Sequence, residues 1–166
     1  MRINLWQLNT LSREVFVHII GGIFEHSPWV ANKAWERRPF HSCQELHESM
    51  MLAVKEAAPG QVLNLIRAHP DLATRLNISE FSTKEQQGVG LDQLSPEEFK
   101  QFSNLNREYM EKFEFPFVYA VRGKTKADIL SAMKARMNHT PFEERQQALV
   151  EIGKITAFRI QDVIEE

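Results

Sequence analysis

The sequence has little cysteine and no excess of positive charge. Cys43 is the single cysteine among 166 residues, which excludes an intrachain disulfide and is typical of a reducing compartment. The net charge is -2, so the basic surface of a nucleic-acid-binding protein is not expected. No apolar run approaches the about 20 residues that a membrane span needs. Residues 1–10 do not resemble a signal peptide, and residues 164–166 are not a peroxisomal address. We therefore expect a cytoplasmic protein with neither nucleic acid nor a membrane as partner.

Several motifs that mark known chemistries are also missing. None of the six histidines forms the i, i+4 pair of a zinc-binding helix, so no metal site is expected. The chain has no Gly-x-Ser-x-Gly elbow and no phosphate-binding glycine loop. Cys43 follows a predicted helix cap among polar residues with no evident base, which disfavours a cysteine nucleophile. These absences disfavour a metal site and a serine or cysteine nucleophile.

Helix signals dominate what is present. Ser42, Ser95 and Thr140 each precede a carboxylate by three residues at the start of a helical pattern, and Thr125 does so more weakly. Only the stretch 115–121 favours an extended chain, and its proline and lack of a partner strand argue against a sheet. The length predicts one domain over residues 1–166. The fold prediction is an all-α, single-domain globular bundle of about eight helices with no significant sheet, near residues 10–24, 28–37, 42–57, 59–68, 82–89, 95–113, 125–137 and 141–164.

His69 is the first candidate for chemistry. It ends a helical run and is followed by Pro70 and Asp71, and the non-helical stretch that it opens extends to about Phe81. A loop of that length is usually functional. An imidazole titrates near neutral pH, so it can donate or accept a proton. The alternative is a structural histidine that faces the negative end of a helix dipole.

Ser82, Glu85 and Gln86 form the second candidate. Ser-x-x-Glu is a capping box, so a purely structural role at a helix start is one interpretation. The other is a binding site, because amide groups at a helix N-terminus attract anions and these side chains would add polar contacts. Glu85 could also face His69 across the loop.

Arg159 lies beside an apolar stripe of the last predicted helix. It could be a side chain that keeps its charged end in water while its stem covers apolar surface. It could instead be a carboxylate clamp, because the guanidinium fork matches carboxylate geometry.

An ordered set of segments gives the chain a family resemblance. In chain order they are Leu8–Ser12, Phe24–Trp29, Ala68–Ala73, Ser82–Leu91, Asn106, Tyr109, Lys112–Val118, Arg122–Gly123 and Glu151–Ile155 with Arg159. With these the chain resembles the OHCU decarboxylase family over nearly its whole length. That family acts on 2-oxo-4-hydroxy-4-carboxy-5-ureidoimidazoline (OHCU) in urate degradation and forms (S)-allantoin. The chain departs from the family pattern at Val89, Glu114 and Tyr119, where alanine, glycine and an aliphatic residue are usual.

The resemblance implies an all-α lyase without a cofactor, a homodimer that takes a small-molecule substrate. It implies that His69, Glu85 and Arg159 are catalytic. The substrate-binding residues that it implies are Pro70, Ser82, Glu85, Gln86, Phe117, Val118, Tyr119, Ala120, Val121 and Arg159. Tyr119 could reshape the pocket wall, since it replaces an aliphatic side chain.

The expected reaction suits these residue types. The carboxylate of OHCU sits beside a C=N bond that can take up the electrons as carbon dioxide leaves, so neither metal nor pyridoxal is required. His69 suits delivery of a proton to the ring carbon, and Glu85 could orient the imidazole or bind the ureido N–H groups. Arg159 and the helix start at Ser82 suit anionic and carbonyl oxygens.

Two alternatives come from other classes of protein. His69-Pro70-Asp71 is the signature tripeptide of J-domains, but the preceding residues 59–68 supply only Arg67 where a basic helix is needed. A helical adaptor could use its tryptophans, Trp6, Trp29 and Trp35, as surface anchors. Binding of a ureido-imidazole or purine analogue would favour the enzyme over either alternative.

Overall fold

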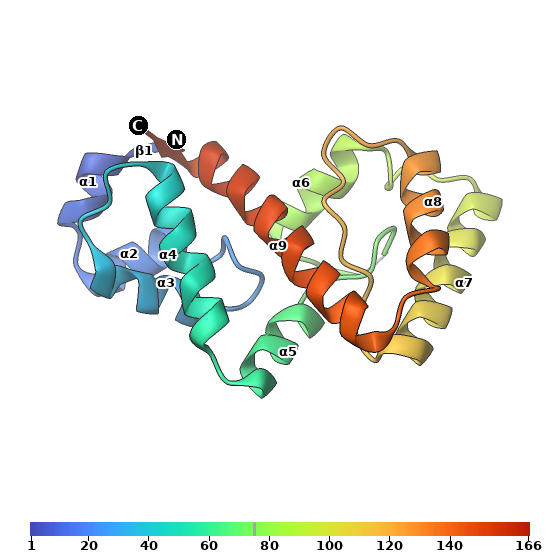
Figure 1. Cartoon of the computed structure of the whole chain (residues 1–166). Coiled ribbons are helices and arrows are strands. Elements are labelled where there is room, and N and C mark those ends of the chain that lie inside the picture. Colours follow the sequence, from blue (N-terminus) through green and yellow to red (C-terminus); the bar gives the residue numbers. More distant parts are fainter. Residues whose placement is uncertain (75) are drawn as a thin grey trace. The chain divides into compact units, whose positions relative to one another are not determined.

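The structure is a computed structural model that describes residues 1–74 and 76–166, and it is almost entirely helical (Figure 1). The all-α prediction with no significant sheet is confirmed. The described residues form nine α-helices where about eight were expected, with one 3-10 helix and two strands of two residues each. The elements are β1 (Ile3–Asn4), α1 (Leu5–Thr10), α2 (Arg13–Ile20), α3 (Trp29–Ala34), η1 (Trp35–Arg37), α4 (Cys43–Glu56), α5 (Pro59–Arg67), α6 (Glu80–Gly88), α7 (Pro96–Phe113), α8 (Lys126–Arg136), α9 (Pro141–Val163) and β2 (Ile164–Glu165).

The predicted helix caps are confirmed at four starts. The Ser42 side chain accepts a hydrogen bond from Glu45 N, and reciprocal capping boxes open α7 at Ser95 and α8 at Thr125. Thr140 exchanges the same pair of bonds with Glu143 before α9. Such caps satisfy amide groups that a helix leaves unpaired, which is why these boundaries were predicted to within two residues.

The first helices differ from the prediction. A single helix over 10–24 was expected, but Asn4 caps α1 and Ser12 caps α2. Both side chains accept a backbone N–H, so the chain restarts as a second helix after Leu11. The prediction missed α1 because six residues are too few to show helical periodicity. It also missed the parallel pair of β1 with β2, which joins Ile3 to Ile164 across nearly the whole sequence.

The described residues form two compact units, Met1–Ala68 with Gly153–Glu166 as unit 1, and His69–Ile152 as unit 2. Helix α9 contributes residues to both. A single domain over residues 1–166 therefore stays a prediction. In unit 1, α3 packs against α2 and α4, and the buried core includes Phe16, Phe24, Leu46 and Met50.

Unit 2 has an aromatic core that starts on α7. The Tyr109 ring lies 4.5 Å from Phe113, 6.0 Å from Phe115 and 5.3 Å from Phe117, measured between ring centroids. Helix α7 ends at Phe113, and its C-cap residue Glu114 has a φ of 63°. Glycine adopts this left-handed conformation most easily, which explains why glycine is the usual residue of the resembled family there. None of the described helices is long and apolar enough to cross a membrane.

Candidate functional site

The loop between α5 and α6 carries the predicted proton-transfer residue. His69 is buried, with 6% of its surface exposed. Two side chains hold the backbone that follows it. Gln86 accepts from Ala73 N at 2.9 Å and donates to the Asp71 carbonyl at 3.1 Å, and Asn106 donates to the Leu72 carbonyl at 2.8 Å. The loop after His69 is therefore fixed at three consecutive residues.

These two bonds give the Gln86 side chain a structural role. It was predicted to bind substrate, and the structure gives its carboxamide two partners on the loop. Ala73 has a φ of 61°, so the turn that Gln86 holds is conformationally costly without support. Substrate contact by Gln86 stays a prediction.

The interpretation of Ser82 as the helix cap is wrong. Helix α6 begins at Glu80, and its cap is Ser79, whose side chain accepts from Ser82 N. Ser79 takes the capping role because the helix starts three residues earlier than that interpretation assumes, and its side chain reaches the amide three residues on, as a cap does. Ser82 and Gln86 are buried, and Glu85 is half-buried beside them on the helix. Residues three and four apart share a helix face, so these three side chains lie together.

The segment 117–121 also lies in unit 2. Phe117, Val118, Ala120 and Val121 are buried and Tyr119 is half-buried. Arg136 donates to the Val118 carbonyl at 2.6 Å, and Ala120 N donates to Glu151 at 3.4 Å. As expected, no strand pairs with this segment among the described residues.

Helix α7 supports both the loop and the segment. Asn106 bonds Leu72 of the loop, and Tyr109 packs on Phe117 of the segment. These two residues are three apart, so they lie on one face of the helix. Sequence analysis quoted both in the family resemblance without assigning them a role, and only their contacts reveal it.

Arg159 belongs to unit 1, where it is 1% exposed. Its Nη1 donates to the Ile23 carbonyl at 3.0 Å and to the Glu25 carboxylate at 2.9 Å. The interpretation as an arginine that keeps its charge in water is therefore wrong. The carboxylate that it clamps in the structure is the chain's own Glu25, and its contact with substrate stays a prediction.

Asp71 is an unexpected polar group of the loop. Its Oδ1 is buried and has no hydrogen-bond partner among residues 1–74 and 76–166, and burial raises the pKa of this carboxyl above its ordinary value. A cavity of about 340 Å³ adjoins it, and Asn106 and Arg107 also line this cavity. Within the described part of the chain, no group of three His, Cys, Asp or Glu side chains is arranged to hold a metal ion.

The surface needed by the two non-enzymatic alternatives is poorly developed. His69 is buried, whereas a J-domain must offer its tripeptide to a partner. Trp35 donates its indole N–H to the Leu11 carbonyl and is covered by Arg38, 3.9 Å from the ring centroid. Trp6 is 73% exposed and is the best candidate for an anchor, but one aromatic side chain does not form a docking surface.

Comparison with known proteins matches the sequence resemblance. A family model described as OHCU decarboxylase matches residues 9–161. The 2-oxo-4-hydroxy-4-carboxy-5-ureidoimidazoline decarboxylase of Haloferax volcanii is 41% identical over 96% of this chain and 95% of its own length. The uric acid degradation bifunctional protein of Bacillus sp. (strain TB-90) is 43% identical over 98% of this chain, but this chain spans only 32% of that relative.

A solved structure has the same fold. The crystal structure of (S)-allantoin synthase superposes with a TM-score of 0.80 at 29% identity, and the match covers 98% of this chain and 54% of that one. A second structure, OHCU decarboxylase in the presence of (S)-allantoin, has a TM-score of 0.69 at 22% identity and supports the fold alone. Since the family model spans nearly all of the sequence, this chain belongs to the OHCU decarboxylase family.

Proposed function

We propose that this protein decarboxylates OHCU to (S)-allantoin in urate degradation, as a carboxy-lyase without a cofactor. The observation that carries the proposal is the family match over residues 9–161, which includes both candidate segments of unit 2. The relatives from Haloferax volcanii and Halalkalicoccus jeotgali, which carry the decarboxylase name, are matched over 95% and 92% of their own lengths.

In the proposed mechanism the C=N bond of the substrate accepts the electron pair as carbon dioxide leaves. His69 delivers a proton to one face of the ring carbon, which sets the configuration of the product. Burial of His69 supports this role, because water that is kept away from the site cannot protonate the ring carbon from the other face. Proton transfer of this kind contributes about 10²–10⁴-fold, and positioning supplies much of the rest.

The remaining predicted residues hold the substrate. Ser82 and Glu85 lie on one face of α6, where they suit the ureido and carbonyl groups, and Glu85 could also orient His69. Pro70 and the segment 117–121 form the proposed pocket wall. Arg159 is proposed to bind an anionic or carbonyl oxygen, and its pairing with Glu25 supports a fixed guanidinium orientation. A cytoplasmic homodimer completes the proposal, on the strength of the single cysteine and the family resemblance.

The test is turnover of freshly made substrate. OHCU generated from urate by an oxidase and a hydrolase should convert to dextrorotatory allantoin faster than it does spontaneously, and circular dichroism of the product measures this. The His69→Asn variant should keep its melting temperature and lose about 10²-fold or more in kcat. Racemic product at the background rate from the wild-type protein would refute the proposal, and an EDTA-sensitive rate restored by zinc would refute its metal independence.

A further inference from the structure

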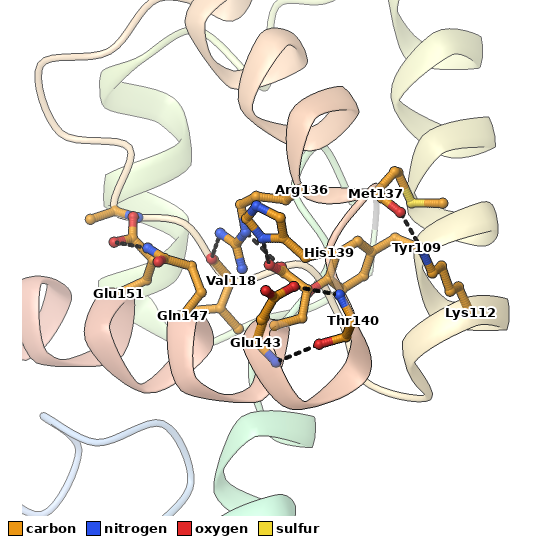
Figure 2. A network of polar contacts seen from close by, with 12 residues as sticks. Tyr109, Lys112, Val118, Arg136, Met137, His139, Thr140, Glu143, Gln147 and Glu151 are labelled. Atoms are coloured by element: carbon orange, nitrogen blue, oxygen red, sulfur yellow. Dashed lines mark hydrogen bonds and ion pairs between the residues drawn. The ribbon is translucent and has the colours of Figure 1, made fainter.

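Two side chains form hydrogen bonds with the backbone of the segment 117–121 from the same edge. Figure 2 shows Arg136 reaching the Val118 carbonyl, at 2.6 Å, and Glu151 beside the Gln147 side chain. Glu151 Oε1 accepts from Ala120 N at 3.4 Å. Arg136 ends α8 and Glu151 lies on α9, so two helices of unit 2 fix this short segment.

The spacing of these two hydrogen bonds determines which backbone N–H and C=O groups of the segment remain available to a ligand. In an extended chain, alternate residues turn their N–H and C=O groups to the same edge. The rings of Phe117 and Tyr119 lie 5.7 Å apart, as expected for neighbours on one side of such a chain. Since Val118 and Ala120 turn their groups toward Arg136 and Glu151, the N–H and C=O of Tyr119 face the opposite edge.

A buried network holds Arg136 in place. Its Nε donates to Glu144 at 2.6 Å, and Glu144 also accepts from the Tyr109 hydroxyl at 2.5 Å and contacts His139 Nδ1 at 2.9 Å (Figure 2). Burial, and then the bond to Glu144, raise the pKa of the Tyr109 hydroxyl far above its ordinary value, so it stays protonated as a donor. The guanidinium also stacks on Phe117, 4.4 Å from the ring centroid.

Stability alone does not account for this arrangement. Glu144 is fully buried and Arg136 is 6% exposed, and a buried ion pair is often no more stabilising than packed apolar side chains. Arg136 Nη2 is also buried without a hydrogen-bond partner among the described residues, which adds a desolvation cost. An apolar pair could not donate a hydrogen bond to the Val118 carbonyl, so it could not fix the orientation of the segment's backbone.

We infer that Arg136 and Glu151 are positioning residues for the decarboxylation, an inference that rests on the proposed function. By holding Val118 and Ala120 from one edge, they present the Tyr119 N–H and C=O to the ureido and carbonyl groups of the substrate. They act through the backbone and do not touch substrate themselves. This contact uses the Tyr119 backbone, so it does not depend on how the Tyr119 side chain shapes the pocket wall.

The test compares Arg136→Lys with Lys134→Arg. Lysine at position 136 keeps the charge beside Glu144 but loses the fork that reaches Val118 as well. Lys134 is the matched control, because it lies on the same helix α8, is exposed, and its exchange also conserves the charge. Well below each melting temperature, Arg136→Lys should lose about tenfold or more in kcat with little change in KM, since small misplacement of positioning groups is costly. Lys134→Arg should match wild type.

Hydrogen exchange of the Ala120 amide gives a readout that does not need turnover. Arg136→Lys should accelerate it, and Lys134→Arg should not. Wild-type kcat in folded Arg136→Lys, or unchanged exchange at Ala120, would overturn the inference. If Arg136→Lys does not fold, Glu151→Met tests the hydrogen bond between Glu151 and Ala120 N by the same two measurements, with the same expected outcomes. An inactive wild type would refute the proposed function and the positioning of substrate. Accelerated exchange in the variant would still show that Arg136 holds the backbone of the segment.

Discussion

A buried arginine–glutamate pair is found in each unit among the described residues, and the two pairs are built alike. Arg159 in unit 1 bonds the Ile23 carbonyl and Glu25, and Arg136 in unit 2 bonds the Val118 carbonyl and Glu144. In both, a guanidinium joins a carboxylate to the backbone of a segment outside the helices. Such a segment has no ladder of its own bonds, so a buried side chain must satisfy its carbonyl.

The pairs differ in what surrounds the carboxylate. Glu144 has a tyrosine and a histidine as further partners, with His139 at 2.9 Å, whereas His26 stands 3.9 Å from Glu25. The histidine therefore lies closer to the paired carboxylate in unit 2 than in unit 1. Removing either arginine should disturb both an ion pair and a backbone carbonyl, whereas the two histidines should matter unequally.

The largest effect is expected when either arginine is removed. Arg136→Met and Arg159→Met should each lower the free energy of unfolding by about 3–5 kcal/mol, because a buried carboxylate is left without its counter-ion. Urea denaturation measures this. The double variant Arg159→Met with Glu25→Leu should regain most of the loss, since the uncompensated charge is gone. A loss below about 1 kcal/mol in a single variant would show that its pair is well solvated.

A smaller effect should separate the two histidines. His139→Asn should lower the free energy of unfolding by about 1 kcal/mol, because it removes a short contact to Glu144. His26→Asn should change it by less than about 0.5 kcal/mol, because its contact is longer and its side chain is 67% exposed. Asparagine also tolerates the φ of 46° at position 26. Equal losses of unfolding free energy in the two variants would contradict the expected difference between the two histidine–glutamate contacts.

The smallest effect concerns Asp71 of the loop, whose Oδ1 has no hydrogen-bond partner among residues 1–74 and 76–166. Burial raises its pKa in the folded state, so the folded protein binds the proton more tightly than the unfolded chain. Stability from this group is present below the unfolded pKa of about 3.9 and falls as pH rises through the folded pKa. Asp71→Asn should therefore be more stable than wild type at neutral pH, and the difference should vanish in acid. Unfolding measured across this pH range checks both the sign and the crossover.

Local signals explain most of what could be predicted. The caps at Ser42, Ser95, Thr125 and Thr140 fixed four helix starts, because a cap is a bond between residues three apart. The same rule failed at Ser82, where Ser79 competes three residues earlier. The candidate loop was found by its motif, but the roles of Gln86 and Asn106 in holding it were not, because each bond joins residues that are far apart in the sequence.

The sequence by itself determined the all-α class, the family and the candidate residues His69, Ser82 and Glu85, because periodicity, capping and motif order are all encoded along the chain. Only the tertiary structure decided which buried charges pair. Arg136 closes α8 and by sequence alone is an ordinary basic residue near a helix end. Its partners come from α9 and the segment 117–121, and its burial makes the guanidinium a link between these elements. Burial and long-range pairing depend on how the helices pack, which no local pattern specifies.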